Sequence, residues 1–276
     1  MPDASLRYVT VNVYRETRSS RTEYILGRNS RSEYRLSQTF RERGPNQPGA
    51  VRVERGPLRA LIQNRQLHSQ FHLDLDARVY TTLHLPEDRI PTSFKTRAPV
   101  HRPSSRTIHV HTETIDTGER REMCGNTARR IIIRTSHRVT PEDDARYGEA
   151  KADCWYIDPP AAWLALHPPM RGHAIFHSGD DTPVFTDVGP RENGFPLFVR
   201  KTEHSRFRDA EGNIRLHTSE DRDEVTEFSE EALNPDLFVP PRDFRRVSRL
   251  PGEPAIPFVL RMRTGWQNFK HKLTGT

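Results

Sequence analysis

Cysteine and lysine are scarce in this chain of 276 residues. It has two cysteines, Cys124 and Cys154, and five lysines beside 38 arginines. Two cysteines are too few for a disulfide scaffold or for a four-ligand zinc site. They can form one bridge in an oxidising compartment, or they can be two separate buried thiols, and the sequence leaves both open.

Long apolar runs are also absent. No segment reaches the roughly 18 consecutive apolar residues of a transmembrane helix, so we expect none. The opening residues, MPDASLRYVT, have neither the basic region nor the apolar core of a signal peptide. On these residues alone, the protein is cytoplasmic or its leader is not part of this chain.

The chain lacks the common motifs of catalysis. It has no Gly-x-Ser-x-Gly nucleophile turn, no Gly-x-Gly-x-x-Gly dinucleotide motif and no phosphate-binding loop ending in Gly-Lys-Ser or Gly-Lys-Thr. We therefore predict a protein without enzymatic activity and without a cofactor.

Positive charge is abundant, with a formal net charge of +6. Residues 1–100 hold 17 basic and 10 acidic side chains, so the whole excess lies there and the rest of the chain is close to neutral. A basic region of this kind can bind nucleic acid or an anionic membrane surface, and a basic module is our first alternative function. We favour a solvated, arginine-rich surface, with nucleic acid not expected as a partner.

Apolar residues alternate with polar ones along many short segments, which is typical of half-buried strands. Segments 8–14, 71–80 and 106–115 show the pattern, and residues 127–137 are rich in β-branched side chains. We expect the alternating residues to line an apolar groove on the sheet, with these candidates: Val9, Val11, Val13, Phe71, Leu73, Leu75, Ile131 and Ile133. A filled core is the alternative role for the same residues.

Helix signals are few. Ser229 can cap a short helix within 229–238, which Pro235 limits to about one or two turns, and Pro160 can start another over 159–167. The fold class is therefore mainly β with minor α: a curved antiparallel sheet or half-open barrel with one or two short helices. We expect one β-rich domain over 1–247, with long loops at 41–50 and 86–105, and a Pro-containing basic tail over 248–276.

The tripeptide Asp116-Thr117-Gly118 has the sequence of an aspartic-protease site. Such a site needs two aspartates that share one proton, and the chain has no second Asp-Thr-Gly or Asp-Ser-Gly. The charged residues Glu119 and Arg120 follow directly, although a buried pair of aspartates tolerates only small neutral neighbours. We therefore predict that Asp116 to Gly118 bend the chain between two strands.

His109 and His111 lie two residues apart and would share one strand face. With Glu113 or Asp116 they could form the metal site of a hydrolase, which is our second alternative function. A zinc site needs three or four converging ligands, so we predict no metal site here.

Several blocks in order resemble a group of uncharacterised bacterial exported proteins. The blocks are 67–85, TIDTGERREMCGNTARRIIIRT (114–135), DCWYID (153–158) and 224–247. These proteins in turn resemble the lipoprotein-carrier-like fold, a curved antiparallel sheet partly closed by helices. The residues that match the family pattern are Thr117, Gly118, Glu119, Gly125, Ala128, Arg129, 131–133 and 155–158. We predict a structural role for the motif Asp116, Thr117, Gly118, Glu119, Gly125, Trp155, Tyr156 and Asp158.

The resemblance implies linked hairpin strands, with Gly125 in a turn or bulge, and implies no catalysis. It also implies export to the periplasm and a groove that holds a lipid or a hydrophobic protein segment. Our expectation is thus a non-enzymatic envelope protein that binds an apolar ligand on its sheet.

Overall fold

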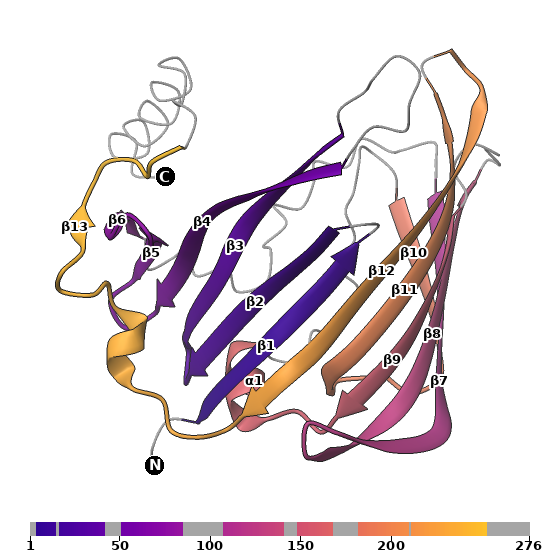
Figure 1. Cartoon of the computed structure of the whole chain (residues 1–276). Helices are drawn as coiled ribbons and strands as arrows, with labels where there is room; N and C mark the ends of the chain where they lie inside the picture. Colours follow the sequence, from indigo (N-terminus) through magenta and orange to yellow (C-terminus); the bar gives the residue numbers. More distant parts are fainter. Residues whose placement is uncertain are drawn as a thin grey trace, which may run out of the picture.

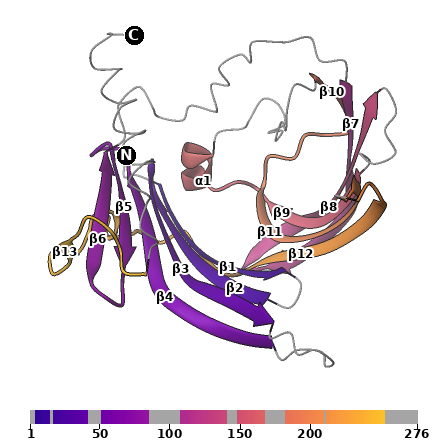
Figure 2. The same ribbon diagram turned by 90° about the horizontal axis from the view of Figure 1, so that it is seen from above.

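The computed structural model describes residues 4–14, 17–41, 51–84, 107–140, 148–167, 182–209 and 211–252 (Figure 1). Their strands form one 13-stranded sheet that is curved and does not close (Figure 2). The predicted loop at 86–105 and most of the loop at 41–50 lie outside these ranges, as does the tail after Gly252. Within the described residues, no helix is long and apolar enough to cross a membrane.

The sheet has two halves that meet at its middle strands. The first half, from its edge inward, is β10 (Thr182–Val188), β7 (Thr107–Met123), β8 (Asn126–Thr140), β9 (Gly148–Ile157), β11 (Phe195–Arg208) and β12 (Ile214–Ser229). The second half continues with β1 (Ser5–Tyr14), β2 (Thr17–Leu26), β3 (Asn29–Arg41), β4 (Val51–Asn64), β5 (Ser69–Asp74), β6 (Val79–His84) and β13 (Arg245–Arg246).

The prediction of a mainly β protein with minor helix is confirmed. Neighbouring strands are antiparallel except at the two edges, where β10 pairs with β7 and β13 pairs with β6 in parallel. The described helical elements are α1 (Ala161–Leu166) and the 3-10 turn η2 (Pro235–Phe238). Thus the sheet is mixed, because a parallel strand that returns from elsewhere in the chain is added at each edge.

The concave face of the sheet carries the larger apolar cluster. Leu6, Ile25, Phe195, Leu197 and Val225 are buried there. Helix α1 lies inside the curve (Figure 2) and adds the side chains of Ala162 and Trp163 to the cluster. The rings of Tyr8 and Trp163 stand edge-on to Phe195, with centroids 5.0 and 4.9 Å away. This cluster fills one end of the concave face.

The convex face of the second half carries the other cluster. It consists of Ala60, Ile62, Phe71, Leu73 and Phe238. The first four alternate along β4 and β5, so that their side chains share one face, and Phe238 of η2 covers them. The second core thus depends on a segment that follows β12, far away in the sequence.

Residues 230–251 run around the β6 edge, and we call this segment the C-terminal clasp (Figure 1). On the convex face, the carbonyl of Phe238 accepts from Asn64 Nδ2 at 3.0 Å. At the edge, β13 pairs with β6. The carbonyl of Pro251 accepts from Arg59 at 2.6 Å, and Arg59 faces away from its neighbour Ala60, toward the concave side.

The predicted helix over 229–238 is wrong, because Ser229 ends β12 and only Pro235–Phe238 are helical. Proline restricts the residue before it to extended backbone, and Asn234 has a ψ of 123°. Asn234 instead caps the short turn by accepting the N–H of Asp236 at 2.9 Å. Leu250 is 2% exposed, so packed structure extends at least three residues past 247.

Candidate functional site

The Asp116-Thr117-Gly118 segment is a bulge inside β7, whereas the sequence predicted a bend between two strands. Asp116 pairs with Ile131 and Arg120 with Arg129, so three residues of β7 lie opposite one residue of β8. Gly118 has a φ of +79°, which favours glycine. The bulge interrupts the ladder without ending the strand.

Asp116 is paired within this bulge. Its Oδ1 accepts the N–H of Gly118 at 2.9 Å, and both carboxylate oxygens accept from the Arg120 guanidinium at 3.1 Å. Hydrogen bonding by Arg120, followed by the Gly118 N–H, holds the pKa of Asp116 below its usual value. A carboxylate held in its charged form is unsuited to the shared proton of a protease pair.

The chain turns between β7 and β8 at Cys124 and Gly125. Both residues have positive φ, 49° and 75°, as a two-residue hairpin turn requires. The Cys124 thiol donates to the carbonyl of Val225 on β12 at 3.5 Å, so the hairpin tip reaches across to the middle of the sheet. Cys154 is buried, which raises its pKa to about 11, and the two cysteines are not bonded to each other.

The eight residues predicted to line a groove do not share one face. Val9, Val11 and Val13 pair through Thr22, Ser20 and Arg18 on the convex side of the sheet, where Phe71, Leu73 and Leu75 also lie. Ile131 is connected by cross-strand pairs through Cys154, Val199 and Asp223 to Asn12, which faces away from Val11. Ile133, two residues along β8, shares the face of Ile131. They therefore lie on the concave face. Alternation fixes the faces within one strand, but it does not say which faces of distant strands agree.

The structure does gather uncharged side chains on the concave face of the first half. The cross-strand partners there run in rows over β7, β8, β9 and β11. Apart from Ile131 and Cys154, which are buried, these side chains are half-buried. We call this surface the neutral concave strip: Thr112, Thr114, Ile131, Ile133, Thr135, Ala150, Ala152, Cys154 and Val199.

Charged groups border the strip on both sides. On the β7 side, Asp116 pairs with Ile131 in the row that continues to Cys154 and Val199. Further charged groups lie on the β12 side. Lys201 and Glu203 of β11 continue its rows and pair with each other at 2.9 Å. Beyond them, Asp221 and Asp223 of β12 both accept from Asn12 Nδ2 at 2.9 Å. The concave face therefore changes from uncharged side chains on β8 and β9 to charged ones on β11 and β12.

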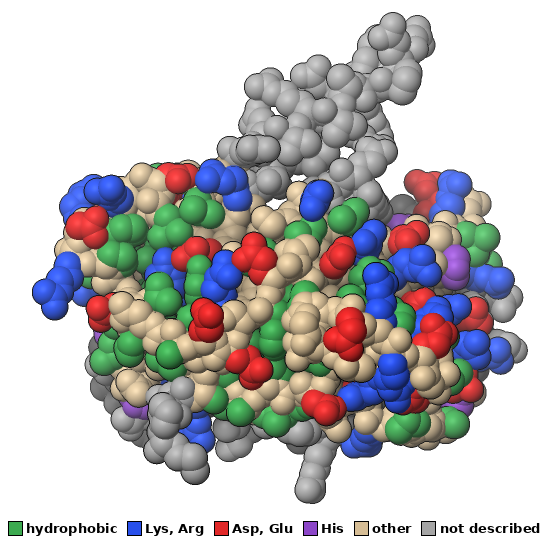
Figure 3. Space-filling model, turned by 60° about the horizontal axis from the view of Figure 1, so that its bottom comes forward, with side chains coloured by type: hydrophobic (Ala, Val, Ile, Leu, Met, Phe, Trp, Pro, Cys, Tyr) green, Lys and Arg blue, Asp and Glu red, His purple; other side chains and the backbone are tan. Residues whose placement is uncertain are grey.

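The convex face of the same strands is charged. Asp153 accepts two hydrogen bonds from Arg130, at 2.9 and 2.8 Å, and pairs with Arg200 at 3.6 Å. The Arg130 hydrogen bonds hold the pKa of Asp153 below its usual value. Glu113 pairs with Arg134 at 3.1 Å. Figure 3 shows acidic and basic side chains interspersed over the visible face, with no large patch of one sign.

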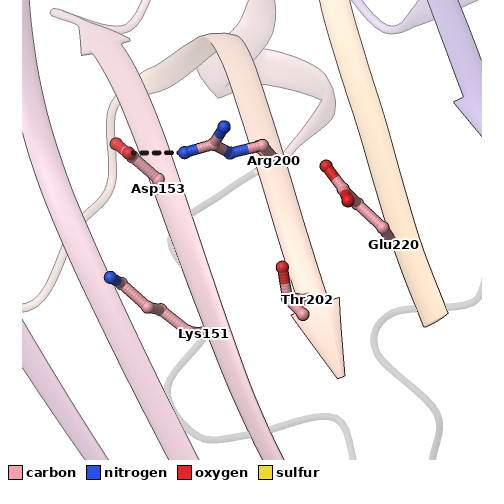
Figure 4. A pocket seen from close by; sticks show the side chains of 5 residues that line it. All are labelled: Lys151, Asp153, Arg200, Thr202 and Glu220. Carbon is pink, nitrogen blue, oxygen red and sulfur yellow. Dashed lines mark ion pairs between the residues drawn. The ribbon is translucent and has the colours of Figure 1, made fainter. Parts of the chain in front are cut away.

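A hollow of about 190 Å³ opens among these charges (Figure 4). Five residues line it, from β9, β11 and β12: Lys151, Asp153, Arg200, Thr202 and Glu220. Charges of both signs surround it, and Asp153 is already paired with Arg130 and Arg200. Its lining is therefore part of the ion-pair lattice of the convex face.

His109 and His111 lie on the charged face, opposite Arg138 and Ser136 of β8. In the described part of the chain, no group of three His, Cys, Asp or Glu side chains is arranged to hold a metal ion. The structure therefore offers these two histidines no third ligand among the described residues.

Ion pairs hold the end of β9, where the residues of DCWYID lie. Arg129 pairs with Asp158 at 2.8 Å and with Glu192 at 2.7 Å. Glu192 also accepts the N–H of Gly194 at 2.5 Å. A side chain at position 194 would collide with the Ile157 carbonyl, so glycine is required there. The guanidinium carbon of Arg121 lies over the Trp155 ring, 6.0 Å from the ring centre. Sequence reasoning missed Glu192, because nothing local distinguishes it from other loop acids.

No protein-family model matches the chain, and no curated protein matches it. The resemblance to exported proteins of the lipoprotein-carrier-like fold therefore stays a prediction from the sequence blocks.

Proposed function

We propose that the protein binds the acyl chain of a lipid on the neutral concave strip. One observation supports this most strongly: over residues 131–135 of β8 and 150–154 of β9 the concave side chains are uncharged, whereas Arg134, Lys151 and Asp153 of the same strands lie on the convex face. Two wet faces would both carry charge, as the convex one does. Transfer of apolar surface from water onto such a strip is favourable.

The shape of the concave face suits a flexible apolar chain. Ala150 and Ala152 are small side chains in the middle of the strip, opposite Thr135 and Ile133. The aromatic cluster around Phe195 and Trp163 closes one end of this face. An acyl chain lying along the strip would keep its polar head near the charged border at Lys201.

An extended polypeptide is a poorer occupant. It would lie on the face of a sheet, where β8 and β9 are already paired with a neighbouring strand on each side. Its own N–H and C=O groups would lose water without gaining partners. An acyl chain has no such groups.

We place this binding in the bacterial envelope. Binding without chemistry, in the bacterial envelope, is what the lipoprotein-carrier-like resemblance implies. The absence of a catalytic motif in the sequence is consistent with it.

The test compares two neighbouring isoleucines. Ile133 lies in the strip, whereas Ile132 points to the convex face opposite Ile115 and Asp153. We expect Ile133→Glu to weaken binding of a fluorescent fatty acid at least about tenfold, because the chain would have to desolvate a carboxylate. Ile132→Glu should bind as the wild type does.

Circular dichroism and thermal unfolding would show that both variants are folded. Ala152→Phe provides a second, uncharged test, because its ring would fill the strip. Equal binding by Ile133→Glu, Ala152→Phe and the wild type would refute the proposal, as would no uptake by the wild type.

A further inference from the structure

The hairpin of β11 and β12 projects beyond the rest of the sheet (Figure 1). On one side, the pairing of β9 with β11 stops at Gly148 and Ser205. On the other, the pairing of β1 with β12 stops at Tyr14 and Asp221. Residues 206–220 therefore form a two-stranded ribbon with no third strand among the described residues.

One face of this ribbon is apolar and basic. Arg206 pairs with Leu216 and Arg208 with Ile214, so these four side chains share a face, which we call the hairpin patch. Leu216 is 77% exposed and Ile214 is 47% exposed. Two adjacent exposed aliphatic side chains on a projecting ribbon are costly to keep in water.

The turn that holds the hairpin patch is well ordered by hydrogen bonds. Asp209 accepts the N–H of Asn213 and the Nε of Arg215, both at 2.8 Å, and Arg208 donates to the Gly212 carbonyl at 2.8 Å. Gly212 has a φ of +86°, which suits glycine. The tip thus presents its aliphatic side chains in a fixed geometry.

Charge at the tip favours an anionic partner. Arg206 and Arg208 flank the two aliphatic side chains. From the pair His204–Thr218 to the tip, no acidic residue shares that face of the ribbon. Asp209 is paired with Arg215, which leaves Glu211 in the turn as the remaining acidic group of the tip.

We propose that the hairpin patch docks onto an anionic lipid bilayer. Leu216 and Ile214 would enter the headgroup region, where aliphatic side chains gain from leaving water, and the arginines would pair with lipid phosphates. A nucleic acid would use the arginines but would leave the two aliphatic side chains exposed. This inference does not depend on acyl-chain binding in the strip.

Co-sedimentation of the full chain with vesicles tests the inference. Vesicles of phosphatidylcholine and phosphatidylglycerol should bind the protein, and vesicles of phosphatidylcholine alone should bind it much less. Leu216→Ser should weaken binding roughly tenfold, and Arg208→Gln roughly fivefold. Glu211→Gln should strengthen it.

Leu67→Ser is the matched control, because Leu67 is also an exposed leucine, at 54%, in the turn between β4 and β5. It should bind as the wild type does, and thermal unfolding should show that Leu216→Ser is as well folded as the wild type. Equal binding to both kinds of vesicle, or equal loss in Leu67→Ser, would overturn the inference. The inference would also be overturned if Leu216→Ser bound vesicles as the wild type does and lost only self-association or DNA binding.

Discussion

Asp116 belongs to a tripeptide with the sequence of a catalytic site, but its surroundings give it a structural role. Its carboxylate is shared between the Gly118 N–H and the Arg120 guanidinium, which together stabilise the bulge in β7. The absence of a second Asp-Thr-Gly and the charges after Gly118 allowed the sequence to predict a structural role. It could not predict a bulge, because the pairing that defines a bulge involves Ile131 and Arg129 of another strand.

We expect Asp116→Asn to lower the free energy of unfolding by no more than about 1 kcal/mol, because exposed ion pairs contribute little. Asparagine keeps an oxygen for the Gly118 N–H, so Asp116→Ala should cost more. Because the folded state lowers the pKa of Asp116, its stabilisation is present above the unfolded-state pKa and is lost as pH falls through the folded-state pKa. Urea unfolding at neutral and acidic pH checks this, and a peptidase activity abolished by Asp116→Asn would contradict it.

At the scale of elements, the C-terminal clasp is the feature that holds the second half together. It covers the convex cluster with Phe238, extends the β6 edge with β13 and reaches Arg59 with the Pro251 carbonyl. A short edge strand also hides the free backbone groups of β6 from other chains. The sequence predicted a helix here that Pro235 limits to one or two turns, but the contacts with β4 and β6 are nonlocal.

Phe238→Ala should therefore destabilise the protein by about 3–5 kcal/mol, the usual cost of emptying a buried aromatic site. Phe238→Leu keeps most of the volume and should cost much less. Denaturant unfolding of the two variants measures the difference. If Phe238→Ala unfolds at the same midpoint as the wild type, the clasp does not hold this core.

At the scale of the whole molecule, alternation in the sequence predicted a curved, open, mainly β sheet. Strand order was not predictable, because β1 pairs with β12 through residues more than 200 positions apart, such as Arg7 and Ser229. Without that order, Val11 and Ile133 could be assigned to one groove, although they lie on opposite faces. The neutral concave strip appears only when β7, β8, β9 and β11 are aligned side by side.

The central claim is that the strip holds an acyl chain, and native mass spectrometry of protein purified from its own host tests it most directly. We expect a population that carries one lipid, and we expect Ile133→Glu to abolish this population while Ile132→Glu preserves it. A clean mass of the bare chain, with no lipid taken up on titration, would contradict the account.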